Sequence, residues 1–465
     1  MFTSINPATG ESGESFAAFD ADAIERALDA ATTGYRQWRT SPIERRTALL
    51  DAIADQWEAN KRRLAETAVR EMGKTITGAI GEVEKCIAGW RYYAREGARH
   101  LAPVEIATAS GHAVAHWLPI GPVLAVMPWN FPYWQVVRFL APTILAGNVG
   151  LLKHASSVQG CAALIEELTT AAGAPAGLFQ NLPIKSDQVA AIIADRRVVA
   201  VTLTGSEGAG AKVAQAAGQA LKKVVLELGG SDPFIVMPSA DLDRAVKTAV
   251  TARVQNAGQS CICGKRMIVH ADIYDAFLER FVAGMAAVKI GDPMDAATGM
   301  GPLSSVAQRD AVLDQVMRAK AAGGRLLVGG EKIDRPGAWM TPGVLVDLDP
   351  TLDVAREEIF GPVAAVYRAA DIDAAIALAN DVPYGLGASV WTADSAEVAR
   401  FARDIESGMM AVNSLLASTP EAPFGGIKLS GHGRELGPWG LHEFMNLKSV
   451  MYADKAGVTG PRAGD

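Results

Sequence analysis

The chain has 465 residues, of which 49% are hydrophobic and 20% are charged, and its formal net charge is −7. This composition is typical of a folded globular protein, and the length exceeds what one hydrophobic core usually serves, so we expect two or three domains. The acidic balance argues against a nucleic-acid partner, and four cysteines are too few for a disulfide framework, which favours a reducing, cytoplasmic compartment.

The N-terminal quarter of the chain is predicted to be mainly helical. Residues 1–7 lack the basic and apolar regions of a secretory signal, so we expect none. Apolar residues then recur at helical spacing among charged neighbours through residues 21–99. Residues 103–127 predict strands around a turn at residues 110–112.

The segment 118–152 has the hydropathy of a membrane span, because Arg138 is its single formal charge. Five prolines interrupt it, and a continuous helix in lipid would lose backbone hydrogen bonds at most of them. We therefore expect a buried strand, a turn and a short buried helix, with no membrane partner. The prolines stand at positions 119, 122, 128, 132 and 142.

Short apolar runs alternate with alanine-rich helical segments through the rest of the chain. This alternation predicts an α/β fold whose parallel sheets are covered on both faces. The first series of candidate strands is 149–152, 198–204, 224–228 and 234–237. The second series is 266–270, 325–328, 363–367 and 388–391.

A phosphate-binding turn is predicted at residues 201–210, although the chain has no G-x-G-x-x-G fingerprint. A strand there leads through Gly205 and Ser206 into a helix, whose first N–H groups can hold a pyrophosphate. Such turns also occur for packing reasons alone. Lys153 ends the preceding apolar strand, where ligands of parallel sheets usually bind.

One thiol and one carboxyl group indicate covalent chemistry. Cys261 follows a glycine and two small polar residues, a context that leaves a thiol accessible as a nucleophile. Glu227 ends an apolar run before two glycines, and burial there would raise its pKa toward that of a general base. Taken alone, the cysteine is equally compatible with a core position and the glutamate with a solvated strand end.

Five motifs, in this order, make the chain resemble the aldehyde dehydrogenases. They are Pro128–Pro132 (PWNFP), Leu226–Gly230 (LELGG), Gly258–Cys261 (GQSC), Glu357–Pro362 (EEIFGP) and Pro423–Gly426 (PFGG). The similarity extends from residue 5 to about residue 452. Three further segments resemble the succinate-semialdehyde dehydrogenase branch, namely 152–155, 229–234 and 433–436.

The resemblance implies an aldehyde dehydrogenase-like domain organisation. A Rossmann-type cofactor-binding domain is expected over residues 1–229, with a protruding oligomerisation hairpin at about 101–118. An α/β catalytic domain is expected over residues 230–430, and a return segment with an oligomerisation strand over residues 431–465. The exposed edges of the hairpin and the terminal strand lead us to expect a homodimer or homotetramer.

The resemblance also implies the catalytic roles. Cys261 would attack the aldehyde carbon, and the Asn130 side chain with the Cys261 backbone N–H would hold the oxyanion. Glu227 would activate the water that hydrolyses the thioester. Read without the resemblance, Asn130 is a polar turn residue between prolines.

The resemblance places a nicotinamide dinucleotide cofactor in this site, and no metal. It assigns Lys153 and Glu358 to the riboses and Ser206, beside Gly205, to the pyrophosphate. Trp129 would form a wall, and the nicotinamide would lie near Phe360. Related enzymes selective for NAD carry a glutamate where this chain has Ser156, and a serine does not repel a 2′-phosphate. We therefore expect NADP to serve at least as well as NAD.

Succinate semialdehyde is the expected substrate, with glutarate semialdehyde or a neutral aliphatic aldehyde as alternatives. On a helix over residues 131–145, Trp134 and Arg138 share a face with Asn130, so Arg138 is expected to line the channel and bind a distant carboxylate. Ser418 matches a second carboxylate contact of the family. At position 255 this chain has a glutamine, whereas several semialdehyde dehydrogenases have an arginine there. Arg138 is also compatible with a purely structural salt bridge.

Two other functional classes remain open at this stage. A non-enzymatic binding protein on this fold would be expected to have lost one of the three catalytic residues, and none is missing. A coenzyme-A-acylating dehydrogenase would not need Glu227, so the retained carboxylate favours hydrolysis. Cys263 is compatible either with packing or with a reversible disulfide to Cys261.

Overall fold

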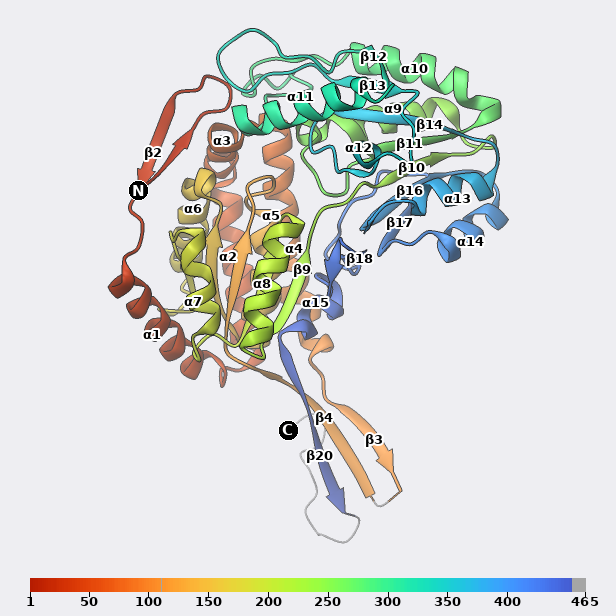
Figure 1. Ribbon diagram of the computed structural model, residues 1–465. Helices are drawn as coiled ribbons and strands as arrows, with labels where there is room; N and C mark the ends of the chain where they lie inside the picture. The colour runs from red at the N-terminus through yellow and green to blue at the C-terminus, as the bar shows by residue number, and fades with distance from the viewer. Residues whose placement is uncertain (110, 454–465) are drawn as a thin grey trace.

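The computed structural model describes residues 1–109 and 111–453. Two large sheets occupy different halves of the molecule, and a narrow three-stranded sheet projects away from both (Figure 1). The chain passes from the first large sheet to the second through residues 228–232, between β9 and β10.

The first large sheet has six strands in the order β19-β9-β8-β5-β6-β7. All its neighbours are parallel except β19, which returns late in the chain and pairs antiparallel with β9. Apolar side chains fill most positions of the inner strands, as expected for a parallel sheet buried on both faces. The strands are β5 (Pro122–Met127), β6 (Val149–His154), β7 (Phe179–Asn181), β8 (Ala200–Thr204), β9 (Lys223–Glu227) and β19 (Gly431–His432).

Helices from the first half of the chain pack on this sheet and share one large hydrophobic core with it. Asp20 and Thr75 begin α1 and α4 by accepting hydrogen bonds from backbone N–H groups of the first turn. The helices are α1 (Ala21–Trp38), α2 (Ile43–Ala59), α3 (Lys61–Met72), α4 (Ile76–His100), α5 (Trp134–Ala146), α6 (Gln159–Ala171), α7 (Val189–Ala194) and α8 (Glu207–Gln219), with short 3₁₀ turns η1 (Ser156–Val158) and η2 (Ser186–Gln188).

The second large sheet has seven strands in the order β12-β13-β14-β11-β10-β16-β17. In β10, Phe234 and Val236 enter one apolar cluster and Ile235 enters another, so both faces are covered. Only β12 runs antiparallel to its neighbour. The strands are β10 (Pro233–Val236), β11 (Arg266–His270), β12 (Arg325–Val328), β13 (Gly343–Val346), β14 (Val363–Ala369), β16 (Gly387–Trp391) and β17 (Met409–Val412).

Helices cover both faces of the second sheet, and one further helix leads the chain back toward the first. These elements are α9 (Leu242–Val254), η3 (Gln255–Gly258), η4 (Ala271–Ile273), α10 (Tyr274–Ala286), α11 (Val306–Ala321), α12 (Asp353–Arg356), α13 (Ile372–Asn380), α14 (Ser395–Asp404) and α15 (Gly437–Glu443).

The projecting sheet joins a hairpin to the C-terminal strand. β20 pairs with β4 from Met445 opposite Pro119 to Ala453 opposite Gly111, and β3 forms the outer edge (Figure 1). Of the expected turn at 110–112, Ser110 lies outside the described residues. The strands are β3 (Val104–Thr108), β4 (Gly111–Pro119) and β20 (Met445–Ala453), and two small sheets pair β1 (Phe2–Ile5) with β2 (Ser12–Phe16) and β15 (Tyr384–Gly385) with β18 (Ile427–Lys428).

The predicted α/β class is confirmed, and all eight apolar runs proposed as strands form strands. The segment 118–152 forms the end of β4, β5, α5 and β6, and no helix in the described part of the chain is long and apolar enough to cross a membrane. In the two large sheets, β7, β13, β17 and β19 were not predicted from the sequence.

Candidate active site

A cavity of about 350 Å³ opens where the two large sheets meet. Most of its walls are loops that follow the carboxyl ends of β5, β8 and β9, which is the usual ligand-binding edge of a parallel sheet. Many residues singled out in the sequence therefore lie together. The lining residues are Pro128, Trp129, Asn130, Gln135, Thr204, Gly205, Ser206, Leu228, Gly229, Cys261, Gln308, Glu358 and Phe360.

Cys261 lies just after a tightly wound turn. Three consecutive residues there, Asn256, Ala257 and Gly258, have φ of 55°, 53° and 73°. Such left-handed backbone is unfavourable for residues with a side chain, so the surrounding structure must hold it. A Cβ at Gly258 would also lie 2.3 Å from the Gly361 carbonyl, which leaves room for glycine alone.

The buried side chain of Arg253 holds this turn. Its Nη2 donates to the carbonyl oxygens of Gly258 at 2.8 Å and Ile359 at 3.3 Å, and also to that of Gly361. The Asn256 side chain adds hydrogen bonds to the carbonyls of Asn130 at 2.8 Å and Gln259 at 3.0 Å. The nucleophile loop is thereby fixed against the loop that carries Asn130.

Asn130 is oriented by two hydrogen bonds. Its Oδ1 accepts from Gln135 Nε2 at 2.9 Å, and its Nδ2 donates to the Gln259 carbonyl at 3.1 Å. A side-chain amide has two N–H donors, and the second has no partner among the described residues. Since Asn130 and Cys261 line the same cavity, this N–H is suited to an oxyanion at the attacked carbon.

His154, at the end of β6, fixes the loop 128–132. Its Nε2–H donates to the Pro132 carbonyl at 2.9 Å, and its Nδ1 accepts from the Ala155 N–H at 2.9 Å. Burial lowers the pKa of His154 to about 4, so the ring is neutral at physiological pH. Sequence reasoning used this residue only as part of a motif.

Glu227 ends β9 and is 2% exposed. Neither carboxyl oxygen has a hydrogen-bond partner within the described structure. Burial raises the pKa of Glu227 well above its usual value, and the neighbouring carboxyl of Glu435 raises it further. The direction agrees with the expectation from the apolar run, and an unpartnered carboxyl is free to exchange a proton with water.

The Cys261 thiol is half-buried and free. Burial raises its pKa to about 12, against the opposing positive charges of Arg138 and Lys265. Lys265, which the sequence did not single out, donates to the Cys261 carbonyl at 2.7 Å and pairs with Glu358 at 2.8 Å. Cys263 is fully buried and its thiol is also free, which suits packing.

Arg138 occupies α5 as expected, but its charge is already paired inside the protein. Its Nε lies 2.5 Å from Glu435 Oε2, close enough for an ion pair although the two groups are not aligned as a hydrogen bond. Its guanidinium carbon lies 4.3 Å from the centre of the Phe424 ring. The structure thus shows the salt bridge that the sequence left open as the alternative to a channel-lining role.

Trp134 and Ser418 do meet, and Lys85 of α4 joins them. The Ser418 hydroxyl accepts from Trp134 Nε1 at 2.9 Å and from Lys85 Nζ at 2.7 Å. No sequence pattern singled out Lys85, because one lysine among the charged residues of an amphipathic helix carries no signal. Gln255 lines a different cavity, of about 380 Å³, together with Lys74 and Phe131.

The residues expected to hold a dinucleotide fall into two groups along the carboxyl edge of the six-stranded sheet. The first group lines the cavity that contains Cys261. Trp129 and Phe360 meet edge to face with ring centres 5.8 Å apart, and Glu358 accepts from the Gly230 N–H at 3.2 Å. Ser206 begins α8, and its side chain does not cap the helix. The uncapped N–H groups there can donate hydrogen bonds to a phosphate.

Lys153 and Ser156 lie beyond the residues that line the cavity. Lys153 is half-buried at the end of β6, where burial lowers its pKa. Within the described chain no carboxylate pairs with it, so its ammonium group is available to an anionic or hydroxyl-bearing ligand. Ser156 is exposed at the start of η1. Both residues are therefore placed to contact a nucleotide that extends from the cavity along the carboxyl edge of the six-stranded sheet.

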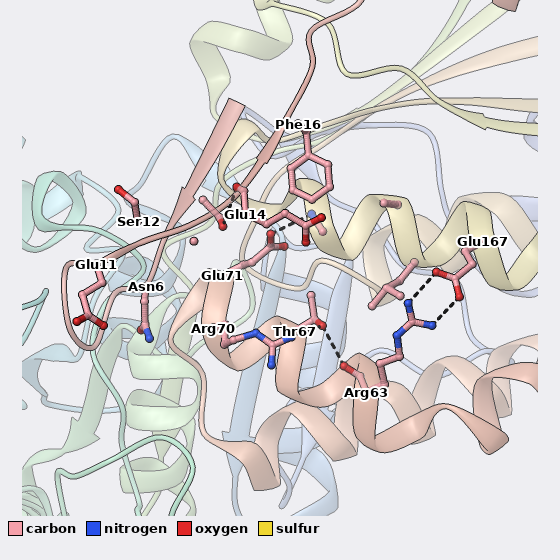
Figure 2. A pocket seen from close by; sticks show the side chains of 15 residues that line it. Asn6, Glu11, Ser12, Glu14, Phe16, Arg63, Thr67, Arg70, Glu71 and Glu167 are labelled. Atoms are coloured by element: carbon pink, nitrogen blue, oxygen red, sulfur yellow. Dashed lines mark hydrogen bonds and ion pairs between the residues drawn. The ribbon is translucent and has the colours of Figure 1, made fainter. Parts of the chain in front are cut away.

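A second cavity, of about 420 Å³, lies between the β1–β2 hairpin and helices α3 and α6 (Figure 2). Its charged groups are largely satisfied within the protein. Arg63 pairs with Glu167 at 2.5 Å, and Glu71 accepts from the N–H groups of Gly160 and Cys161, each at 2.9 Å. None of the candidate catalytic residues lines it.

Comparison with known proteins identifies the family. A family model described as "Aldehyde dehydrogenase family" matches residues 1–450. Succinate-semialdehyde dehydrogenase (NADP+) 1 of Mycobacterium tuberculosis is 49% identical over 452 residues, which cover 97% of this chain and 99% of that protein. These matches confirm the resemblance seen in the motifs.

Solved structures of similar proteins support the same family assignment. Succinic semialdehyde dehydrogenase from Streptococcus pyogenes, in complex with NADP+ as the cofactor, is 40% identical with a TM-score of 0.96, covering 98% of this chain and all 100% of that one. Succinate-semialdehyde dehydrogenase from Burkholderia pseudomallei is 34% identical with a TM-score of 0.94, covering 97% and 94%. With sequence, fold and site geometry in agreement, the chain belongs to the aldehyde dehydrogenase family.

Proposed function

We propose that the protein oxidises succinate semialdehyde to succinate with NADP as the hydride acceptor. The proposal is supported by the M. tuberculosis relative that bears this activity in its name and by the S. pyogenes structure that holds NADP+. The observation that carries it is the gathering of Cys261 and Asn130 in one cavity, whose wall includes Leu228, the residue that follows the unpartnered Glu227.

Cys261 is the nucleophile in this proposal. Its sulfur forms a bond to the aldehyde carbon, and the thiol proton leaves to water or to the Glu227 carboxylate. The free N–H of Asn130 and the Cys261 backbone N–H donate to the resulting oxyanion. When bound, the cofactor supplies the hydride acceptor that turns the Cys261 adduct into a thioester.

Glu227 completes the cycle by activating water. In its ionised form it takes a proton from a water molecule, whose oxygen attacks the thioester carbon. The carbon–sulfur bond breaks, succinate leaves, and the thiol is restored. Glu227 suits this task because no donor among residues 1–109 and 111–453 competes for its carboxyl oxygens.

The cofactor is proposed to lie along the edge formed by β6 and β8. Lys153 and Glu358 would hold the riboses, and Ser206 with the start of α8 would hold the pyrophosphate. A hydroxyl at Ser156 leaves space for a 2′-phosphate without opposing its charge. The chemistry of these donors supports NADP at least as well as NAD.

The domain division predicted from the sequence remains a proposal. It is supported by the passage from the six-stranded to the seven-stranded sheet between Glu227 and Pro233, and by the return of β19 to the first sheet. A homodimer or homotetramer is also proposed. The apolar side chains of Val104 and Ile106 on the edge strand β3 are 51% and 44% exposed, which would favour burial against a second copy.

Product analysis tests the proposed activity. Purified protein supplied with succinate semialdehyde and NADP should form one succinate for each reduced cofactor, at the same rate with and without coenzyme A. A requirement for coenzyme A, with succinyl-coenzyme A as the product, would instead indicate an acylating enzyme.

A further inference from the structure

A buried lysine is hydrogen-bonded to the backbone of the nucleophile itself. Lys265 follows Cys261 by four residues, and its side chain is 1% exposed. Its Nζ donates to the Cys261 carbonyl oxygen at 2.7 Å. Since only four covalent bonds separate that oxygen from the sulfur of the same residue, the ammonium group lies within about 8 Å of the thiol. At this distance a buried cation stabilises a thiolate.

Two carboxyl groups lie beside the same lysine. Glu358, which lines the cavity together with Cys261, pairs with Lys265 Nζ at 2.8 Å. The backbone N–H of Lys265 donates to the Asp232 carbonyl at 3.0 Å. The Asp232 carboxyl accepts from the Gly387 N–H at 3.1 Å, and its other oxygen has no hydrogen-bond partner among the described residues. One cation therefore faces two carboxyl groups next to the nucleophile.

The passage between the two large sheets leaves room for this cluster because it carries two glycines. A Cβ at Gly229 would lie 2.5 Å from Glu358 Oε2. A Cβ at Gly230 would lie 2.9 Å from Asp232 Oδ1 and 3.0 Å from the Cys261 carbonyl oxygen. A side chain at either position would displace these groups, so the close contact between the carboxyl groups and the nucleophile loop depends on both glycines.

The charge of Lys265 favours the thiolate against the effect of burial. Burial raises the pKa of Cys261, the two cations Arg138 and Lys265 lower it, and the two carboxyl groups raise it. Of the two cations, Lys265 is the one that is hydrogen-bonded to Cys261 itself. The charged groups that act between the thiol and its surroundings are Arg138 of α5, Lys85 of α4, Lys265, Glu358 and Asp232.

We propose that Lys265 is a positioning residue for the nucleophile: its ammonium group holds the Cys261 carbonyl and stabilises the thiolate, and Glu358 weakens that stabilisation by pairing with the same cation. The inference deepens the proposed function and rests on it for Cys261 as the nucleophile. Removing the two partners should therefore change the reactivity of the thiol in opposite directions.

The test measures how fast iodoacetamide alkylates Cys261 at pH 8 in the protein without cofactor, followed by mass spectrometry of the peptide that contains Cys261. Because burial raises the pKa of the thiol far above 8, the rate is proportional to the thiolate fraction. Lys265→Met should slow alkylation about tenfold, and Glu358→Gln should accelerate it several-fold. Lys289→Met, which removes an exposed lysine, is the matched control and should leave the rate unchanged.

Opposite changes in the two variants would support the inference, since a loop that had merely loosened would change in the same direction in both. An unchanged rate in either variant, or a slower rate in both, would overturn it. If Lys265→Met does not fold, Glu358→Gln decides alone by the same criterion. The assay contains neither aldehyde nor cofactor, so its result is independent of the product analysis. Opposite changes in a protein that forms no succinate would reject the proposed function alone.

Discussion

Two groups whose pKa burial raises control the chemistry at the scale of single residues. Burial raises the pKa of Cys261 to about 12, so its thiol is protonated in the resting site at pH 7, and burial also raises the pKa of Glu227 well above its usual value. Each becomes reactive only after losing a proton, and the ionised fraction of each grows as pH rises.

The rate of cofactor reduction in the first turnover should therefore increase with pH between about 6 and 9, as more of the Cys261 thiol ionises. Stopped-flow measurement of the burst with succinate semialdehyde checks this prediction. A burst rate that is independent of pH across this range would show that ionisation of the thiol does not limit the first turnover.

Arg138 acts on the same site through its charge. It lowers the pKa of both Glu227 and Glu435 and pairs with the latter. Arg138→Met should leave two buried carboxyl groups without this cation and raise their pKa values further. We expect kcat to fall for succinate semialdehyde and butanal by a similar factor. A loss confined to succinate semialdehyde would return the carboxylate-binding role to Arg138.

At the scale of structural elements, the nucleophile loop depends on a single buried arginine. Arg253 donates hydrogen bonds to a carbonyl of the left-handed turn, Gly258, and to one of a second loop, Ile359, and each buried acceptor left unpaired costs about 1–3 kcal/mol. Arg253→Met should thus lower the free energy of unfolding by at least that amount and slow acylation. Urea unfolding measures the expected loss of stability, and Lys247→Met, at an exposed position on the same helix, serves as the control. Equal midpoints for the two variants would contradict this account.

Sequence patterns predicted the elements better than the contacts between them. Runs such as 224–228 predict strands because parallel strands buried on both faces are continuously apolar. The partner of Arg138 was not predictable, since Glu435 lies on a segment that returns to the first sheet from the far end of the chain. Lys85 was missed for the same reason, because only tertiary packing brings Ser418 to it.

The catalytic candidates could be proposed from the sequence because their motifs are local. Cys261 follows three small or polar residues, and Glu227 ends a strand, so each motif specifies its own loop. The supporting residues Arg253 and Lys265 were not identified, because a buried cation has no signature in sequence until the carbonyl groups around it are known.

At the scale of the whole molecule, the projecting sheet predicts self-association. β20 and β3 pair with the two edges of β4, and β3 has a free outer edge (Figure 1). The apolar side chains of Val104 and Ile106 on β3 are exposed. Sedimentation at micromolar concentration should show a dimer or tetramer. A single species of 48.9 kDa under these conditions would rule this out.

In the proposed mechanism, the complete enzyme works through a Cys261 thioester that is hydrolysed by water activated by Glu227. Its most direct test is mass spectrometry of the Glu227→Gln variant, quenched in acid after mixing with succinate semialdehyde and NADP. The account predicts one equivalent of reduced cofactor and a succinyl group on the peptide that contains Cys261, with Cys261→Ala showing neither. Undiminished turnover in Glu227→Gln, or a succinyl group attached elsewhere, would contradict it.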